Sequence, residues 1–357
     1  MIHGGEIYGR PKIKYDFSVN INPLGIPEGV RGRLRDHFAM LEQYPDPNCG
    51  ELRAALERST GIPAGQILCG NGASELIEAA VRAVRPRRIL LTAPSFSGYR
   101  HAAEGAGAEI RYHRLLREEN FDLTQRYLED LTSGTDMAIL CSPANPVGNL
   151  IDHALLMQIV EDCERRGIWL MVDECFLGFA ADGEERTMRR LLAADGEERP
   201  KRLMVLDAFT KRFAMPGIRL GYLMAQDPEI LQKVHAQQPE WSVSVPAQIA
   251  GLAALETERA YMESARGLVI SERRRMAQAL SSLGFAVFPG EAGYLFFSSE
   301  TELFEPLLSR GFLIRRCDNY EGLERGDYRI AVRRPEDNSR LLRALEEIAG
   351  TGGDHAG

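Results

Sequence analysis

The sequence lacks the features that would place it in a membrane or on nucleic acid. No stretch of its 357 residues approaches the roughly 20 apolar residues that cross a bilayer. The N-terminal segment MIHGGEIYGRPKIKYDF has no apolar core of a signal peptide. The formal net charge is −8, and no run of lysine and arginine is present to neutralise a phosphate backbone. We therefore expect a soluble, cytoplasmic protein that binds neither membrane nor nucleic acid.

Paired cysteines are also missing from the sequence. The six cysteines are scattered at positions 49, 69, 141, 163, 175 and 317, and no two of them form a C-x-x-C pair. This spacing argues against a zinc site and against a disulfide framework. We expect free thiols in a reducing compartment and no bound metal.

Short apolar runs recur along the first two thirds of the chain. They occupy 88–92, 137–142, 168–174, 202–208 and 220–225. Such runs are typical of strands buried in a mostly parallel sheet. Amphipathic helical patterns lie between them, for instance at 74–84 and at 153–166, the second preceded by Asp152 as an N-cap. The alternation predicts a doubly wound α/β domain.

The pattern changes after residue 245. One long helical stretch is expected over 245–283, followed by shorter strands and turns at 285–290, 293–298, 312–317 and 328–332. We interpret this as a connecting helix that leads into a smaller α/β domain. The expected division is an N-terminal arm with part of the small domain at 1–40, a large domain at 41–245, and the connecting helix with the small C-terminal domain at 246–350.

Lysine is scarce, and one of the five lysines stands out. Lys211 directly follows the apolar strand VLDAFT and precedes a loop with a proline, a glycine and Arg219. In an open parallel sheet, ligands bind just past the carboxyl ends of the strands. A lysine that forms an imine needs such a partly desolvated place near other cations. Lys211 is therefore the candidate nucleophile, although a surface lysine at a strand exit is the plain alternative.

Three further segments follow strands or open helices. Asp173 ends an apolar strand and could pair with a protonated pyridine nitrogen, or could instead cap a helix or bind a metal. The glycine-rich turn at 70–75 offers free backbone N–H groups to a phosphate, or merely caps its helix. Asn145 could donate its amide to a phenolic oxygen, although Asn-Pro also marks a turn. The order and strand-end positions of all four signals fit a single site.

Together these segments resemble a known family. The motif T-K-x-x-x-x-P-G-x-R-x-G-Y spans 210–222, D-E-x-F spans 173–176, N-P-x-G spans 145–148 and G-N-G-x-S-E spans 70–75. Over nearly its whole length the chain is similar to the fold-type I pyridoxal-phosphate enzymes of the aspartate aminotransferase superfamily. The resemblance implies a large domain with a mostly parallel seven-stranded sheet, a smaller α/β domain, and pyridoxal 5′-phosphate as cofactor.

The resemblance also implies a role for each matching residue. Lys211 would hold the cofactor as a Schiff base and carry protons, and Asp173 would partner the pyridine nitrogen. Asn145 would contact the cofactor's O3′, and Phe96 would lie against the ring face. Phe176 departs from the pattern, because many relatives have a tyrosine there that bonds to O3′. The cofactor phosphate would be held by Ala73, Ser74, Thr210 and Arg219.

A homodimer is implied by one tyrosine. Tyr44, in the segment QYPDP, matches a tyrosine that in relatives reaches the cofactor phosphate across a dimer interface.

The reaction is indicated by the two ends of the chain. Within the superfamily, the chain is most similar to the branch of histidinol-phosphate aminotransferases and threonine-phosphate decarboxylases. HGG at 3–5, DFSVNINPLG at 16–25, LIRRCDNYEGL at 313–323 and YRIAV at 328–332 are similar to the decarboxylases of cobalamin biosynthesis. This implies decarboxylation of L-threonine O-3-phosphate to (R)-1-amino-2-propanol O-2-phosphate. The alternatives are an aminotransferase that uses histidinol phosphate or an aromatic amino acid with 2-oxoglutarate, and a catalytically silent binding protein.

The substrate contacts are expected from five residues. Arg329 is the best candidate to grip the substrate carboxylate, because a guanidinium matches that group with two parallel hydrogen bonds. Arg333, four residues on, either assists or sits at the surface. The candidates for the substrate phosphate are His3, Asn22 and Arg315, each of which could instead be an arm, turn or solvated residue.

Overall fold

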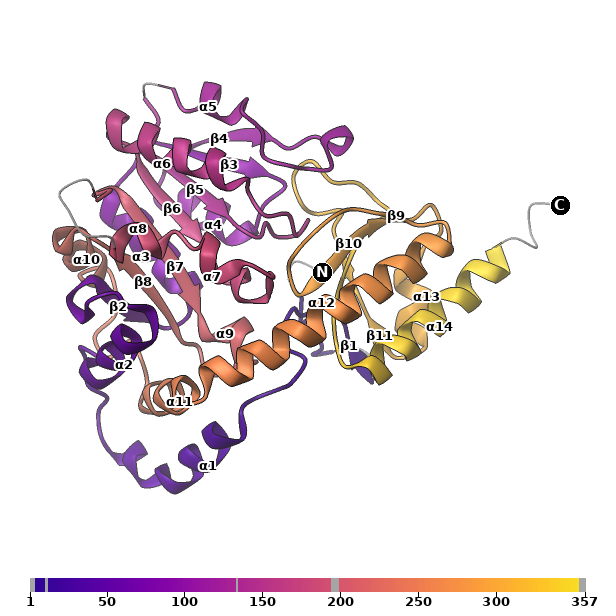
Figure 1. The fold of residues 1–357 in the computed structure, drawn as a ribbon, viewed down its shortest axis with the longest axis horizontal. Helices are drawn as coiled ribbons and strands as arrows, with labels where there is room; N and C mark the ends of the chain where they lie inside the picture. The colour runs from indigo at the N-terminus through magenta and orange to yellow at the C-terminus, as the bar shows by residue number, and fades with distance from the viewer. Residues whose placement is uncertain (1–3, 10–11, 133, 194–198, 353–357) are drawn as a thin grey trace.

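Two groups of strands organise the chain into a large and a small lobe (Figure 1). The computed structural model describes residues 4–9, 12–132, 134–193 and 199–352. Among them, no helix combines the length and apolar character needed to cross a membrane.

The large lobe is built on a seven-stranded sheet of order β2-β8-β7-β6-β5-β3-β4. Only β8 runs antiparallel to its neighbours, which confirms the mostly parallel seven-stranded sheet. The five expected strands are present, and β2 and β4 add to them. β2 is short, and β4 at the edge alternates exposed residues with half-buried or buried ones, so neither appears as an apolar run. The strands are β2 (Ile67–Gly70), β3 (Arg88–Ala93), β4 (Glu109–Arg114), β5 (Met137–Cys141), β6 (Trp169–Asp173), β7 (Leu203–Ala208) and β8 (Gly221–Ala225).

Helices cover both faces of this sheet, because its strands are apolar on both sides. Leu90 packs into one layer with α2, α6 and α11, and its neighbours Ile89 and Leu91 pack into the other with α3, α4 and α10. The Asp152 carboxylate caps α6 as expected, accepting from the Leu155 N–H at 2.9 Å. These helices are α2 (Gly50–Thr60), α3 (Ala73–Val84), α4 (Ser97–Gly105), α6 (His153–Arg166), α10 (Pro228–His235) and α11 (Val245–Leu255).

The small lobe contains an antiparallel sheet of order β12-β13-β10-β9 and a two-stranded parallel pair, β1 with β11. The expected strand at 312–317 is divided at Ile314, since β11 pairs with β1 and β12 pairs with β13. Its elements are β1 (Tyr15–Asp16), β9 (Ala286–Val287), β10 (Tyr294–Ser298), β11 (Phe312–Leu313), β12 (Arg315–Arg316), β13 (Asp327–Ala331), α13 (Phe304–Ser309) and α14 (Pro335–Gly352).

The single helix expected over 245–283 is wrong, because the structure has two. α11 ends at Leu255 and α12 (Glu258–Ser282) begins after Thr257, whose φ of −119° and ψ of 9° are not helical. α11 is buried in the core of the large lobe, whereas α12 crosses to the small lobe, so the chain must change direction (Figure 1). No proline or glycine marks this break in the sequence.

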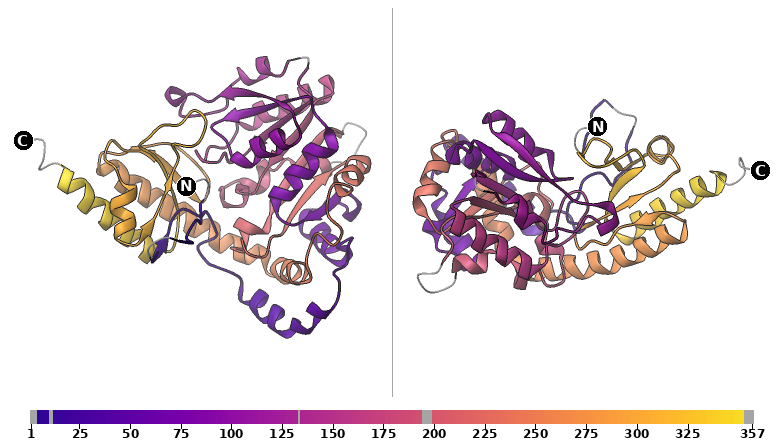
Figure 2. Two further views of the ribbon diagram at one scale, coloured as in Figure 1. Left: turned by 180° about the vertical axis from the view of Figure 1, so that it is seen from behind. Right: turned by 90° about the horizontal axis from the view of Figure 1, so that it is seen from above.

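The N-terminal segment passes between the two lobes (Figure 2). Its strand β1 belongs to the small lobe, and α1 (Glu28–Asp36) packs against α11 of the large lobe. The residues between them therefore lie where the lobes meet. Shorter helices complete the large lobe, namely α5 (Tyr127–Asp130), α7 (Gly183–Arg186), α8 (Arg189–Ala193) and α9 (Phe209–Arg212).

Candidate functional site

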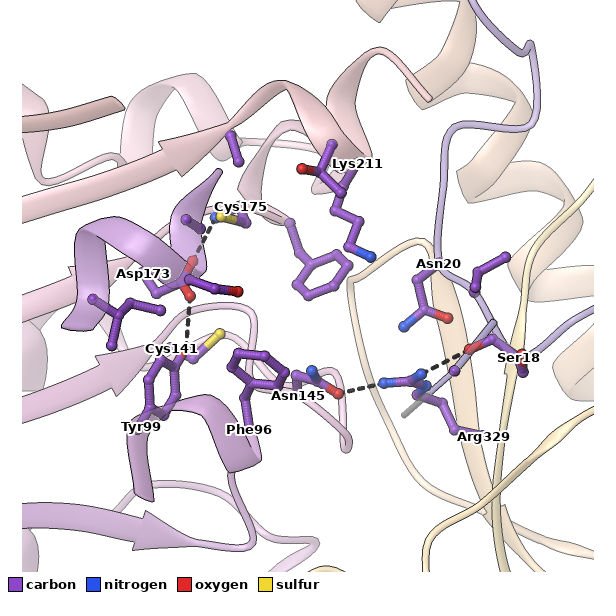
Figure 3. Close-up of a pocket in the computed structure, with 18 of the residues that line it drawn as sticks. Ser18, Asn20, Phe96, Tyr99, Cys141, Asn145, Asp173, Cys175, Lys211 and Arg329 are labelled. Carbon is purple, nitrogen blue, oxygen red and sulfur yellow. Dashed lines mark hydrogen bonds between the residues drawn. The ribbon is translucent and has the colours of Figure 1, made fainter. Parts of the chain in front are cut away.

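A pocket of about 300 Å³ lies where the carboxyl ends of β5, β6 and β7 face the small lobe and the N-terminal segment (Figure 3). This is the position at which open α/β sheets bind ligands. The pocket brings together nine of the residues expected from the sequence: Ala73, Ser74, Phe96, Asn145, Asp173, Thr210, Lys211, Arg219 and Arg329.

Lys211 projects into this pocket from the short helix α9, directly after β7. Its Nζ lies 5.9 Å from the centre of the Phe176 ring, so one side of the amine faces an apolar surface. Burial, and next the charge of Arg329, lower the pKa of Lys211 to about 8. The amine therefore loses its proton much more readily than an exposed lysine, as a nucleophile requires.

Asp173 ends β6, the strand next to β7, and is 6% exposed. Its Oδ2 accepts a hydrogen bond from the Tyr99 hydroxyl at 2.7 Å, and its Oδ1 accepts from the Cys175 N–H at 3.0 Å. Both donors are neutral, so they orient the carboxylate without cancelling its charge. A buried carboxylate held in this way suits a cationic partner inside the pocket.

The start of α3 forms a cradle for an anion. Gly72 has a φ of 85°, and a Cβ there would lie 2.5 Å from Nη2 of Arg219, so only glycine admits the guanidinium. α3 has no side-chain cap, which leaves its first N–H groups free to bind a ligand. Ser74 and Thr210 line the pocket beside them. Arg219 itself adopts a left-handed φ of 57°, a conformation that is uncommon for non-glycine residues.

Arg329, on β13, closes the pocket from the small lobe and is 5% exposed. Its Nη2 donates to the Ser18 carbonyl at 2.9 Å, and its Nη1 donates to Oδ1 of Asn145. Asn20, when its amide oxygen faces Arg329, accepts from Nε at 3.1 Å and from Nη1 at 3.2 Å. The Asn20 side chain also lines the pocket, so its NH₂ group can donate to a ligand.

Asn20 is the residue that the sequence reasoning missed, because it selected Asn22. Asn22 is 1% exposed and lies outside the pocket lining. Its side-chain amide donates to the Arg212 carbonyl at 2.8 Å, and its N–H donates to the Lys211 carbonyl at 3.0 Å. The alternation in SVNIN suggests that both asparagines face one way, but a turn begins at Asn22, where Oδ1 accepts from the Leu24 N–H at 3.0 Å. The structure thus assigns Asn22 to holding the Lys211 segment.

Three more predicted residues, Arg333, Arg315 and Tyr44, also lie outside the pocket lining. Arg333 donates through Nη1 to the Asp16 carbonyl at 2.7 Å, which holds β1 in the small lobe. Arg315 is 1% exposed, donates to Asn319 Oδ1 at 2.8 Å and lies 5.2 Å from the ring centre of Tyr320, a pocket residue. Tyr44 is 79% exposed and contacts Trp241 of its own chain. His3 is outside the described residues.

Glu174 follows Asp173 but belongs to the scaffold and not to the pocket. It is 5% exposed and accepts hydrogen bonds from Thr187 Oγ1 at 2.5 Å and the Met188 N–H at 2.6 Å. Burial raises the pKa of Glu174 to about 7 in spite of these contacts.

A pH dependence of stability follows from Glu174. Its folded pKa lies above the unfolded value of about 4.3, so the stabilisation is present below that value and is lost as pH rises through about 7. Glu174→Gln should flatten the fall in the free energy of unfolding between about pH 5 and 8, by at most about 1.4 kcal/mol per pH unit. Urea unfolding at several pH values measures this, with the exposed Glu185→Gln as control. A slope identical to that of the wild type would contradict the assignment.

Comparisons with known proteins cover both lobes. The sequence model of the family "Aminotransferase class I and II" matches residues 12–345. The threonine-phosphate decarboxylase of Salmonella typhimurium is 37% identical, over 97% of this chain and 96% of that protein. A histidinol-phosphate aminotransferase of Desulfitobacterium hafniense is 32% identical, over 92% of this chain and 90% of that protein. The crystal structure of the histidinol-phosphate aminotransferase from Clostridium acetobutylicum has a TM-score of 0.86 at 29% identity, covering 94% of this chain and 99% of that one.

Proposed function

The chain belongs to the aminotransferase class I and II family, and we propose that it is a pyridoxal-phosphate-dependent decarboxylase of L-threonine O-3-phosphate, which it converts to (R)-1-amino-2-propanol O-2-phosphate. The observation that carries the proposal is the pocket itself. It combines a lysine of lowered pKa, a buried aspartate, an anion cradle and a buried arginine within one cavity. The similarity to the decarboxylase, which runs the length of both chains, supports the choice of reaction.

The residues of the pocket fit pyridoxal phosphate. Lys211 would bind its aldehyde carbon, Asp173 its ring nitrogen, and the cradle of Ala73, Ser74, Thr210 and Arg219 its phosphate. When bound, this cofactor withdraws the electron pair left at the substrate Cα after a bond to that carbon breaks.

Asn145 and Phe176 determine which hydrogen bonds the pocket could offer to the cofactor's O3′. Because Asn145 Oδ1 is occupied by Arg329, its Nδ2 remains to donate to the phenolic O3′. Phe176 has no polar group to offer there, and its 5.1 Å edge-to-face contact with Tyr294 makes this wall of the pocket apolar. Of these two residues, only Asn145 would therefore donate a hydrogen bond to O3′.

The protein side chains direct which bond breaks. Arg329 would hold the substrate carboxylate on the side of the small lobe, and this orientation would select the bond from Cα to the carboxylate as the one that breaks. After carbon dioxide leaves, the Nζ of Lys211 would deliver a proton to Cα. Because the pKa of this amine is lowered to about 8, Lys211 can be neutral when it binds the cofactor and protonated when it delivers the proton.

The substrate phosphate would be bound at the N-terminal segment. Asn20 offers an amide NH₂ group to the pocket, and Arg315 lies behind Tyr320 at the same end. His3, which directly precedes the pocket residue Gly4 in the sequence and is outside the described residues, is proposed as a third phosphate-binding residue.

A product assay tests the proposed reaction. The protein, loaded with pyridoxal phosphate, should release carbon dioxide from threonine phosphate and form the amino alcohol phosphate with no 2-oxoglutarate present. Release that needs an oxo acid, together with an oxo product, would instead indicate the aminotransferase. The histidinol-phosphate aminotransferase relative makes histidinol phosphate the substrate for that second assay.

The two asparagines should separate substrate binding from structural support. Asn20→Ala should raise KM for threonine phosphate about tenfold, since one hydrogen bond to a charged group is lost, and should also lower the melting temperature, since the buried Arg329 loses its contacts to the Asn20 oxygen. Asn22→Ala should lower the melting temperature by several degrees and leave KM nearly unchanged, because the side-chain hydrogen bonds to the Arg212 carbonyl and from the Leu24 N–H are lost while the residue lies outside the pocket lining. Steady-state kinetics and thermal unfolding of both variants measure this. Equal effects of the two variants on KM would contradict it.

A homodimer is the second part of the proposal. Large apolar side chains are exposed around the 3₁₀ helix Phe38–Glu42 and at a neighbouring loop, namely Phe38, Met40, Leu41, Tyr44 and Trp241. An exposed apolar group of this kind is typical of a protein interface. Because Tyr44 lies outside its own pocket, we place its hydroxyl at the cofactor phosphate of a second copy.

The dimer can be tested with two substitutions. Phe38→Asp should shift the protein toward monomers in sedimentation velocity and weaken cofactor retention, because a charge would be buried at the interface. Tyr44→Phe should leave the dimer intact and raise the dissociation constant for pyridoxal phosphate about tenfold. A wild-type protein that is monomeric at all concentrations would refute this part of the proposal.

The cysteines support a cytoplasmic protein. All six are buried and none forms a disulfide. Free thiols persist in a reducing compartment, so we propose the cytoplasm as the location.

A further inference from the structure

Tyr99 contacts the proposed cofactor acid from a separate element. It lies in the first turn of α4, is 1% exposed and lines the pocket. Its hydroxyl donates to Asp173 Oδ2 at 2.7 Å, and its ring meets the Phe96 ring edge to face, with centres 5.5 Å apart (Figure 3). No expectation from the sequence involved Tyr99.

The carboxylate of Asp173 is fixed by two donors from different directions. The Cys175 N–H that binds Oδ1 is part of the same chain segment, two residues further on. The Tyr99 hydroxyl that binds Oδ2 reaches it from α4, across the ends of β3 and β5. One donor alone would let the carboxylate turn about its bond to Cβ, whereas two donors determine its plane. Each oxygen still has a second lone pair for a ligand in the pocket.

The hydroxyl acts as a donor throughout the working pH range. Burial, and next the charge of Asp173, raise the pKa of Tyr99 well above its ordinary value. Tyr99 therefore keeps its proton and cannot become a competing base beside the acid.

We propose that Tyr99 is a positioning residue, whose hydroxyl holds the Asp173 carboxylate toward the ring nitrogen of the bound cofactor; this inference rests on the proposed function. The N-cap and first turn of α4 then supply both Phe96, which would lie against the cofactor ring, and the hydroxyl that orients the Asp173 carboxylate. A small shift of α4 would disturb both the contact of Phe96 with the cofactor ring and the orientation of the Asp173 carboxylate. The position of this helix would therefore affect how strongly the cofactor withdraws electrons.

Tyr99→Phe tests the inference, because it removes only the hydroxyl. A matched control exists in Tyr222→Phe, since Tyr222 is 2% exposed and donates to the buried Asp207 Oδ2 at 2.9 Å, outside the pocket lining. In Tyr99→Phe we expect a kcat about tenfold lower with KM within about twofold of the wild type, because the residues that grip the substrate are unchanged. The dissociation constant for pyridoxal phosphate, measured from its absorption, should rise about tenfold.

The control separates positioning from general stability. Tyr222→Phe should lower the melting temperature but leave kcat and the cofactor dissociation constant near their wild-type values. The inference is overturned if Tyr99→Phe matches the wild type in both quantities, or if Tyr222→Phe shows the same losses. If the wild-type protein takes up no pyridoxal phosphate, both the proposed function and the role of Tyr99 are overturned. If the wild type binds the cofactor and Tyr99→Phe behaves like the wild type, only the role of Tyr99 is overturned.

Discussion

Lys211→Ala should lower the turnover of threonine phosphate by at least about 10⁴-fold, because in the proposed reaction the same amine both binds the cofactor and returns a proton to Cα. Lys211 is the lysine in the pocket lining, so no second amine there can take over these two roles among the described residues. The fold should survive, since the side chain is only half-buried and its segment is held by the Asn22 contacts to the backbone.

The exposed Lys201→Ala is the matched control, and its activity should equal that of the wild type. Single-turnover measurements with threonine phosphate, with circular dichroism to verify folding, give the comparison. Retention of more than about one tenth of the wild-type rate by Lys211→Ala would exclude the amine from the chemistry.

Arg329→Gln should lower kcat/KM by about 10² to 10³-fold, because the buried guanidinium proposed to hold the substrate carboxylate is replaced by a neutral amide. Arg333→Gln is its control, since Arg333 holds the Asp16 carbonyl and lies outside the pocket lining. An equal loss in the two variants would show that the effect comes from the small lobe as a whole and not from substrate binding.

The same substitution should also change the titration of Lys211. The cation of Arg329 lowers the pKa of Lys211, so its removal should raise that pKa from about 8 toward that of a free lysine, while the larger effect of burial persists. The reaction of Lys211 with an amine-specific reagent in the cofactor-free protein should then reach its midpoint at a higher pH than in the wild type. Peptide mass spectrometry over a pH series measures this, and a midpoint that stays or falls would contradict the electrostatic argument.

The strand-end part of the site could be predicted from the sequence for a physical reason. Parallel strands buried on both faces leave apolar runs, and their carboxyl ends meet along one edge of the sheet. Asp173 and Lys211 follow β6 and β7, which are neighbours in that sheet, so their proximity follows from the strand order. The motifs around Asn145 and Arg219 identified further residues that line the pocket on the side of the large lobe.

The wall from the small lobe could not be predicted in the same way. Whether Asn20 or Asn22 faces the pocket depends on where a turn starts, and both lie in the same pattern of alternating polar residues. Arg329 and Arg333 are four residues apart near the end of β13, and only the packing of β1 decides which of them reaches the pocket. Tyr99 was hidden because a tyrosine in an amphipathic helix usually indicates core packing. The break between α11 and α12 likewise arises because the chain must change direction to cross from the large lobe to the small lobe. No proline or glycine in the sequence marks it.

The most direct test of the central claim is to find the cofactor on Lys211. Wild-type protein incubated with pyridoxal phosphate, reduced with borohydride and digested should yield a peptide that contains Lys211 and carries the mass of the reduced cofactor, in nearly one equivalent per chain. The other described lysines, at positions 12, 14, 201 and 233, should remain unmodified at the same cofactor concentration. A label distributed over these lysines, or absent from the Lys211 peptide, would contradict the account.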